Sequence, residues 1–486
     1  MANLSLHKKA RLKAAILITT LLEDEDECTS HLKLLTLIEA YVRQKQEVSK
    51  SRSRIAKLRK KKQRVSWCEF QESITDTQFR RMFRMPRTCF KKLCLKIEET
   101  VGENRFKSEQ FLKNLFYEQS REARTYKANM STTGGYISGE IKVAIALRML
   151  AGGSYLDLFL IYDIFHSHAF SILHEVVTMW FCNDEIICIN GKDYIKDVNR
   201  MKEVSREFGE SCKCGVFKGC IGALDGWLVK IKQPTRKDNV SNPGDFYSRK
   251  GFYGINVQVI VDRSKRVIYK SILCRGAEHD SSAFKSSDLY PTLMEERNNL
   301  ERLGFYFIGD SAYSLRSFLI TPFDNAVHGD HKDAFNFYHS SSRIVVECTF
   351  GEIDMRWGIL WSPLKYSLRR NAKIIDACLR LHNFIVEDRL ANQSLNSINQ
   401  GVNDNEMFLD DIAREQTDTP DNATGVFGGE EEMVFDNRRG RPVLEDTESN
   451  TGGKIIRERL RREIEDGDWV RPRANWFRER NRVMMN

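Results

Sequence analysis

The sequence predicts an α/β fold, a mixed β-sheet flanked by helices, preceded by an all-helical region. Short runs rich in valine and isoleucine, which favour strands, are concentrated between residues 218 and 320. Apolar residues at helical spacing follow these runs as far as residue 387 and also dominate residues 67–185. This order of elements along the chain favours a sheet that is covered by helices.

Changes in composition divide the 486 residues into several parts, since the chain is too long for one compact domain. A polar stretch rich in Asn, Asp, Thr and Gly, with many acidic residues, is expected to be disordered. The predicted parts are a basic N-terminal arm (1–66), a helical region (67–185), a linker (186–217), the α/β domain (218–389), the acidic disordered segment (390–453) and a basic C-terminal tail (454–486).

Four strands and three helices are predicted in the α/β domain. The second and third strands are joined by the short polar loop Asp262–Arg266, which is typical of a hairpin. The predicted strands are Ile221–Ile231, Gly254–Val261, Val267–Leu273 and Phe305–Ile308, and the predicted helices are Ser281–Arg297, Ser340–Ile359 and Ala372–Glu387.

Residues 141–179 are predicted to form three helices separated by short turns. Val143, Leu147 and Leu150 share one face of the first helix, which ends at Ala151–Ser154. Ser167 is a good N-cap for the third helix. A helix, a tight turn and a second helix form the layout of a helix-turn-helix DNA reader. A plain packed bundle is an equally good interpretation of this spacing.

The charge distribution indicates a polyanionic partner, and DNA fits this description. The formal net charge is +9. A basic cluster in the N-terminal arm comprises Lys57, Arg59, Lys60, Lys61, Lys62 and Arg64. Such a cluster is typical of a nuclear-import signal or a phosphate-contacting arm, although an ordinary solvated basic helix has the same composition. We therefore expect the protein in the nucleus.

No membrane segment or signal peptide is expected. The apolar run Ala14–Leu22 is too short to span a bilayer and lacks a small-residue cleavage site. An intracellular location with reduced cysteines follows. Cys212, Cys214 and Cys220 cluster in the sequence, but no pair of ligands at zinc spacing accompanies them, so a zinc site is not favoured.

Three acidic residues stand in or next to predicted elements. Asp225 interrupts the apolar first strand, where an unpaired charge is costly to bury. Asp310 follows the fourth strand, and Glu347 lies in a predicted helix. Carboxylates are the hard oxygen ligands that Mg²⁺ prefers, and two such ions support in-line phosphoryl transfer. Isolated acids at strand ends more often cap helices or form salt bridges, so spacing alone leaves both interpretations open.

The blocks around these acids resemble those of PIF/Harbinger-type DDE transposases. The matching blocks between Gly219 and Glu387 are CIGALDGWLVKI, FYSRKGFYGINVQVIVD, RGAEHDSSAF, FIGDSAY, SSRIVVECTFGEIDMRWGIL and ACLRLHNFI. The upstream stretch IALRMLAGGSYLDLFLIYDIFHSHAFSILHEVV resembles the helix-turn-helix region of the family. Trp227 departs from the family, which more often has Thr after Asp-Gly, and we expect this residue to alter the wall of the groove.

The resemblance implies an RNase H-like fold with Asp225, Asp310 and Glu347 as catalytic, metal-binding acids. It implies two divalent ions, Mg²⁺ or Mn²⁺. Asp280 is expected to be a supporting metal-binding acid, because it follows the third strand, whereas the second ligand of this fold lies at the fourth. The family also implies a Myb/SANT-like DNA-binding partner protein, short A·T-rich target sites and a homo-oligomer on transposon-end DNA.

Basic and aromatic residues near the acids are candidates for DNA contacts. Arg249 and Lys250 can neutralise phosphates, and Tyr247 or Tyr253 can stack on a base. Aromatic residues in a hairpin also cover the core, and this alternative stays open. Arg343, one helical turn before Glu347, is expected to hold that carboxylate or to contact the scissile phosphate.

Two further motifs are weaker candidates. His382 and Asn383 are interpreted as structural, since no acidic partner for catalysis is near them. Arg439-Gly440-Arg441-Pro442 resembles an AT-hook core, in which Arg439 and Arg441 enter the minor groove of A·T-rich DNA. The acidic residues just before this motif would weaken such binding, and short motifs of this kind also occur by chance.

Three functional hypotheses follow. The first is a metal-dependent endonuclease and strand-transferase of a Harbinger-like cut-and-paste transposon. The second is a domesticated, catalytically silent DNA-binding or adaptor protein derived from such a transposase, against which the intact acids argue. The third is a two-metal phosphatase-like enzyme or a nuclease with another purpose, against which the basic arms and the helix-turn-helix pattern argue.

Overall fold

The computed structural model describes residues 67–102, residues 137–398 apart from 163, 213, 236, 237 and 239, and residues 447–472. All of them belong to one compact unit of the chain. The basic cluster at 57–64 and the AT-hook-like motif at 439–442 lie outside the described residues. Within the described ranges, no helix is both long enough and apolar enough to cross a bilayer.

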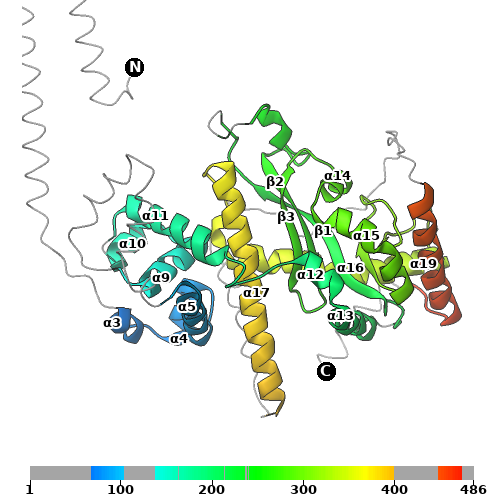
Figure 1. Cartoon of the computed structure of the whole chain (residues 1–486), viewed down its shortest axis with the longest axis horizontal. Coiled ribbons are helices and arrows are strands. Elements are labelled where there is room, and N and C mark those ends of the chain that lie inside the picture. Colours follow the sequence, from blue (N-terminus) through cyan, green and yellow to red (C-terminus); the bar gives the residue numbers. More distant parts are fainter. Residues whose placement is uncertain are drawn as a thin grey trace, which may run out of the picture. The chain divides into compact units, whose positions relative to one another are not determined.

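A five-stranded mixed sheet forms the centre of the α/β domain (Figure 1). Its order is β3-β2-β1-β4-β5; β2 is antiparallel to both β1 and β3, and β4 and β5 are parallel to β1. The strands are β1 (Cys220–Lys230), β2 (Gly254–Val261), β3 (Val267–Arg275), β4 (Tyr306–Gly309) and β5 (Leu319–Ile320). The four predicted strands are confirmed, whereas β5 is too short to show a period in the sequence.

Alternation along the strands directs side chains into two separate cores. Ala223 and Trp227 of β1 face the core that α16 and α17 cover, and Leu224 faces the core that α12, α14 and α15 cover. Ile221 also faces the second core, because the register of β1 with β4 shifts between Cys220 and Ala223. The first two helices are α16 (His331–Arg356) and α17 (Leu368–Ile398), and the other three are α12 (Gly191–Lys196), α14 (Asp280–Lys285) and α15 (Leu289–Leu303). The sheet is therefore covered on both faces, as predicted.

The helical region packs around one central helix. Ten of the twelve residues of α9 are buried, so this helix has no broad solvent-exposed face. The helices of the helical region are α3 (Trp67–Glu72), α4 (Asp76–Phe83), α5 (Arg87–Val101), α9 (Gly139–Leu150), α10 (Tyr155–Tyr162) and α11 (His166–Val176). The N-cap of α11 is Phe165, so the predicted Ser167 cap is wrong. The predicted order of helix, turn and helix is present in α9 to α11. Binding of DNA by these helices stays a prediction.

Several residues that were expected to be linker, disordered segment or tail are helical. The expected linker 186–217 contains α12 and α13 (Val198–Ser211), and α13 packs on β1. α17 continues through residues 390–398, and α19 (Thr447–Asp466) packs on α16 and β5. Leu460 and Ile464 of α19 are buried, but so few apolar residues among many charges make a weak periodic signal. Helices at 198–211 and 390–398 thus differ from the expected linker and disordered segment, and the division of the chain into these parts stays a prediction.

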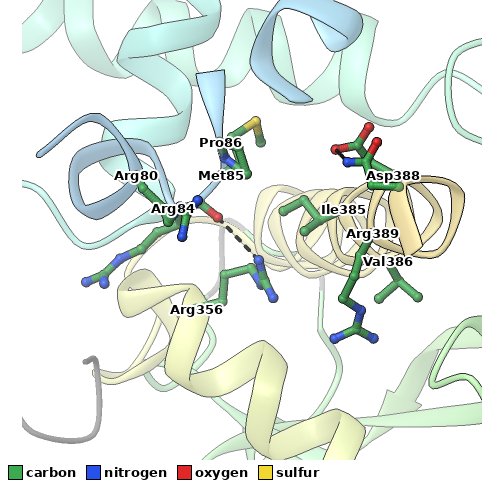
Figure 2. A pocket seen from close by; sticks show the side chains of 10 residues that line it. Arg80, Arg84, Met85, Pro86, Arg356, Ile385, Val386, Asp388 and Arg389 are labelled. Atoms are coloured by element: carbon green, nitrogen blue, oxygen red, sulfur yellow. Dashed lines mark hydrogen bonds between the residues drawn. The ribbon is translucent and has the colours of Figure 1, made fainter. Parts of the chain in front are cut away.

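The helical region contacts the α/β domain at the turn between α4 and α5 (Figure 2). Arg356, near the end of α16, donates a 3.3 Å hydrogen bond to the backbone oxygen of Arg84. Lys92 of α5 pairs with Asp388 of α17 at 2.5 Å. A small open pocket of about 60 Å³ lies among these elements. The same two helices that cover one face of the sheet thus also hold the helical region.

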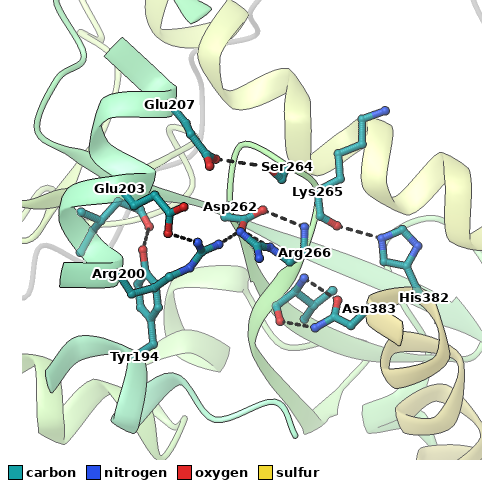
Figure 3. A network of polar contacts seen from close by, with 12 residues as sticks. Tyr194, Arg200, Glu203, Glu207, Asp262, Ser264, Lys265, Arg266, His382 and Asn383 are labelled. Atoms are coloured by element: carbon teal, nitrogen blue, oxygen red, sulfur yellow. Dashed lines mark hydrogen bonds and ion pairs between the residues drawn. The ribbon is translucent and has the colours of Figure 1, made fainter. Parts of the chain in front are cut away.

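Polar contacts tie the turn between β2 and β3 to neighbouring helices (Figure 3). Asp262 is 1% exposed and accepts hydrogen bonds from Arg266 at 2.7 Å and from Arg200 of α13 at 3.0 Å. Two guanidinium groups offset only part of the cost of burying this carboxylate, since burial still raises the pKa of Asp262 to about 8 against the charge of Arg200.

His382 and Asn383 of α17 hold the same hairpin (Figure 3). The Asn383 side chain donates to the backbone oxygen of Val267 and accepts from its N–H, both at 2.8 Å. The His382 Nε2 atom lies 2.8 Å from the backbone oxygen of Lys265. These contacts support the structural interpretation of both residues.

Replacing Asn383 by Ala should destabilise the protein by about 2–4 kcal/mol, because a buried N–H and a buried carbonyl of Val267 both lose their partner. Urea denaturation measures this loss. Asn392→Ala is the control on the same helix, since its amide makes a single 3.4 Å contact with Asp388. An equal loss of stability in both variants would show that the two bonds to Val267 do not hold the hairpin.

Candidate active site

The parallel pairing of β1 and β4 brings Asp225 and Asp310 to neighbouring positions. Leu224 of β1 pairs with Gly309, the last residue of β4. Asp225 directly follows Leu224, and Asp310 directly follows Gly309. Strand alternation turns the Asp225 side chain towards α16, on the face opposite to Leu224. The sheet therefore fixes the relative positions of the two acids.

α16 brings Glu347 and Arg343 to the same side of β1 as Asp225. Nη1 of Arg343 lies 3.1 Å from Oδ2 of Asp225, and its Nη2 donates to Oε1 of Glu347. The Arg343 side chain is 16% exposed, Asp225 is 19% exposed and Glu347 is 51% exposed. The expected pairing with Glu347 is present. The contact with Asp225 was not expected, because it joins residues far apart in the chain.

The acids lie in surroundings that disfavour negative charge. Burial raises the pKa of Asp225 to about 6; Arg343 opposes this shift, and the carboxylates of Asp310 and Glu347 add to it. Burial also raises the pKa of Asp310, against a backbone hydrogen bond from Ala312 and the charge of Arg343. One nearby guanidinium does not fully compensate this group of carboxylates, which therefore favours a further cation.

Asp280 approaches β1 from the opposite face. A Cβ atom at Gly226 would lie 2.2 Å from Oδ1 of Asp280, so a glycine at position 226 leaves the space that the Asp280 side chain occupies. Asn256 and Gln258 of β2 donate to the same oxygen at 2.8 and 3.2 Å. Asp280 is nevertheless close enough to raise the pKa of Asp310. This position fits a supporting acid, and its role as a metal ligand stays a prediction.

Asn256 and Gln258 are site residues that the sequence analysis missed. Both are buried in β2, which otherwise carries valine and isoleucine, and the hydroxyl of Tyr313 donates to Oε1 of Gln258 at 2.7 Å. Two amides in an apolar strand are a signal, because buried polar groups need partners. Together they hold Asp280 beneath the sheet edge.

In the parts of the chain that the structure describes, no three His, Cys, Asp or Glu side chains are arranged to hold a metal ion. The donor set still fits a hard divalent cation, since it consists of carboxylate oxygens that are partly buried and incompletely neutralised. Asp225, Asp310 and Glu347 are the residues that would hold Mg²⁺ or Mn²⁺. In this structure Arg343 binds two of them.

The turn before β2 carries the candidate DNA contacts Arg249 and Lys250. Both side chains are exposed, and the Arg249 guanidinium lies 3.9 Å from Asp280. The rings of Tyr247 and Tyr253 pack edge to face at 5.1 Å, and Tyr247 remains half exposed. Cations and one exposed ring are thus available beside the acids. DNA contact by these residues and by Arg343 stays a prediction, as does contact by Arg439 and Arg441.

Trp227 fills the core and does not line a groove. Its ring stacks on Phe350 of α16 with 5.6 Å between centroids and 13° between planes, and the side chain is buried. The expectation that Trp227 alters a groove wall is therefore wrong. Strand alternation explains this position, since Trp227 shares the α16 face with Asp225.

Cys212 and Cys214 lie close together after α13, with 3.0 Å between their Sγ atoms. Cys220 is buried in β1, where its thiol contacts the backbone oxygen of Gly222 at 3.6 Å. All three are free cysteines, and in the described ranges they do not form a metal-binding group.

The mixed sheet covered by helices, with acids in β1, after β4 and on a later helix, fits a DDE domain of the RNase H-like kind. Residues 224–383 match the family model described as DDE superfamily endonuclease. With the relatives given next, this match shows that the segment is a DDE domain of the Harbinger type.

Curated relatives cover the same region. "Protein ALP1-like" of Arabidopsis thaliana is 25% identical over 274 residues, which are 54% of this chain and 64% of that protein. "Putative nuclease HARBI1" of Bos taurus is 29% identical over 175 residues, and that of Homo sapiens 27% over 175 residues; each match covers 35% of this chain and 46% of the relative. The chain thus spans less than two thirds of these relatives. No solved structure matches the chain.

Asp225→Asn should stabilise the metal-free protein at alkaline pH. The folded-state pKa, about 6, is above the ordinary 3.8, so the folded protein binds this proton more tightly than the unfolded chain. Ionisation of Asp225 therefore lowers stability as pH rises through this interval. We expect the variant to gain about 1–2 kcal/mol at about pH 8, because Asn is itself a buried polar group and offsets part of the shift.

Urea denaturation in EDTA at two pH values measures this gain. It should vanish near pH 4, where the carboxyl group is protonated in the folded protein. A variant that is less stable than the parent at pH 8 would mean that the Arg343 pair outweighs the burial of Asp225.

Proposed function

We propose that this chain cuts and joins DNA as the metal-dependent nuclease of a Harbinger-type cut-and-paste element. The observation that carries the proposal is that Arg343 joins Asp225 to Glu347, while the pairing of β1 with β4 sets Asp310 beside Asp225. The match of this region to the DDE superfamily endonuclease model supports it. Acids on two paired strands and on a helix, two of them joined by one guanidinium, fit in-line phosphoryl transfer better than helix capping or surface salt bridges.

Each residue has a distinct part in this proposal. Divalent cations, when bound, supply charge stabilisation for the attacking and leaving oxygens. Asp225 and Asp310 are held by paired strands, so they fix where positive charge is bound. Glu347 is half exposed on α16, so a DNA strand can reach this carboxylate from solvent. Arg249 and Lys250 neutralise backbone phosphates next to the acids.

The remaining features of the proposal rest on the family resemblance and on charge. We propose transposon-end and target DNA as substrates, two Mg²⁺ or Mn²⁺ ions, and a homo-oligomer on the DNA. We also propose a Myb/SANT-like DNA-binding partner protein and a location in the nucleus. The net charge of +9 supports a nucleic-acid partner.

Alanine at Asp225, Asp310 or Glu347 should each reduce Mn²⁺-dependent nicking of supercoiled DNA by roughly 100-fold or more, since acids that act as a unit cannot replace one another. Conversion of plasmid from supercoiled to open-circular form measures this activity, and EDTA should abolish it. Asp354→Asn is the matched control, an acid on the same helix whose pKa burial also raises to about 6. If the three alanine variants cut as well as the parent, the assignment is wrong.

A domesticated, catalytically silent DNA-binding protein is the second candidate. The observation that favours it is the pairing of Arg343 with both Asp225 and Glu347. A parent protein that binds DNA but nicks none of it with Mg²⁺ or Mn²⁺ would support this candidate. Hydrolysis of small phosphate esters without DNA cleavage would instead support a phosphatase-like enzyme.

A further inference from the structure

We propose that Arg343 is a resident counterion that competes with the divalent cation for Asp225 and Glu347, and that an incoming DNA phosphate releases it. This inference rests on the proposed function, because it concerns the same three acids. It assigns to Arg343 a positioning and gating role beyond the DNA contact expected from the sequence.

The hydrogen bonds of Asp225 show what the guanidinium occupies. Oδ1 accepts from the backbone N–H of Gly226 at 2.9 Å, and Oδ2 faces Nη1 of Arg343 at 3.1 Å. Both oxygens of this β1 carboxylate thus already have a donor. On the other side, Nη2 of Arg343 donates to Oε1 of Glu347. A cation that took these oxygens as ligands would have to replace the guanidinium.

Because of their charges, the guanidinium of Arg343 and the divalent cation should exclude each other at these carboxylates. The guanidinium and a divalent cation compensate the same carboxylates, and both together at the same oxygens would repel each other. Arg343 is largely buried, so water screens this repulsion only partly. Binding of the cation is therefore opposed as long as Arg343 stays between Asp225 and Glu347.

A DNA phosphate offers Arg343 another partner. The planar guanidinium fork binds phosphate oxygens as well as carboxylates. The side chain arises from α16 one turn before the half-exposed Glu347, so it lies at the edge where a DNA strand would meet the acids. A phosphate that draws Arg343 away frees the carboxylates, and DNA and cation should then strengthen each other's binding reciprocally.

Arg249 is a natural comparison within the same site. Its side chain is 76% exposed, and it lies 3.9 Å from Asp280 on the other face of β1. Exposed pairs at this distance contribute little. Arg249 should therefore affect the affinity of the acids for a cation much less than Arg343.

A purely structural role for Arg343 predicts the opposite result. If the guanidinium only holds Asp225 and Glu347 together, its removal lets the carboxylates separate. The affinity of the site for a cation then falls or stays the same. The direction of the change in metal affinity distinguishes the two roles, and no measurement of cleavage is needed.

The test titrates the metal-free full chain with Mn²⁺ and follows free Mn²⁺ by electron paramagnetic resonance. Arg343→Gln should bind Mn²⁺ roughly fivefold or more tightly than the parent, and Arg249→Gln should change affinity by less than about twofold. A short mixed-sequence DNA duplex should tighten Mn²⁺ binding by the parent and have little effect on Arg343→Gln. Unchanged or weaker Mn²⁺ binding by Arg343→Gln overturns the inference.

Two further variants keep the outcome decisive. Arg343→Lys keeps the positive charge but cannot bridge both carboxylates with a planar fork, so its Mn²⁺ affinity should lie between those of the parent and Arg343→Gln, with a smaller effect of DNA than in the parent. It decides the question if Arg343→Gln does not fold. Glu347→Gln shows whether Mn²⁺ binds at the acids. Loss of Mn²⁺ binding in Glu347→Gln without any gain in Arg343→Gln removes only this inference. Failure of the parent and of Arg343→Gln alike to bind Mn²⁺ removes the proposed function as well.

Discussion

The guanidinium of Arg343, shared by Asp225 and Glu347, is the interaction on which the candidate site depends. It compensates two carboxylates that lie close together beside β1. Burial raises the pKa of Asp225, and the negative charges of Asp310 and Glu347 raise it further. Buried charges are retained only when they are paired or bind a cation. Pairing with Arg343 therefore makes the burial of these acids tolerable without a bound cation.

The scaffold around this interaction is rigid where position matters. Parallel pairing of Leu224 with Gly309 sets the two aspartates, and the absence of a side chain at Gly226 admits Asp280 from the other face. The amide of Asn383 fixes the hairpin that forms the adjacent part of the sheet. α16 carries both Arg343 and Glu347, so one helix delivers an acid and its counterion together.

Local patterns predicted most of the fold and part of the site. Valine and isoleucine runs marked β1 to β3, a short apolar run marked β4, and the four-residue spacing of Arg343 and Glu347 indicated their contact. β5 has only two residues, and α19 buries few apolar residues, so neither has a clear period. The contact of Arg343 with Asp225 depends on how the helix packs against the sheet, which no local pattern contains. The amides of Asn256 and Gln258 were visible as polar residues in an apolar strand and were missed.

The central claim, that Asp225, Asp310 and Glu347 hold a divalent cation together, has a direct test. Fe²⁺ takes the place of Mg²⁺, and ascorbate with hydrogen peroxide then generates hydroxyl radicals that cut the polypeptide beside the bound ion. The account predicts cuts clustered next to residues 225, 310 and 347, suppressed by excess Mg²⁺ and lost in Glu347→Gln. Cuts elsewhere in the chain, or none near these three positions, would contradict it.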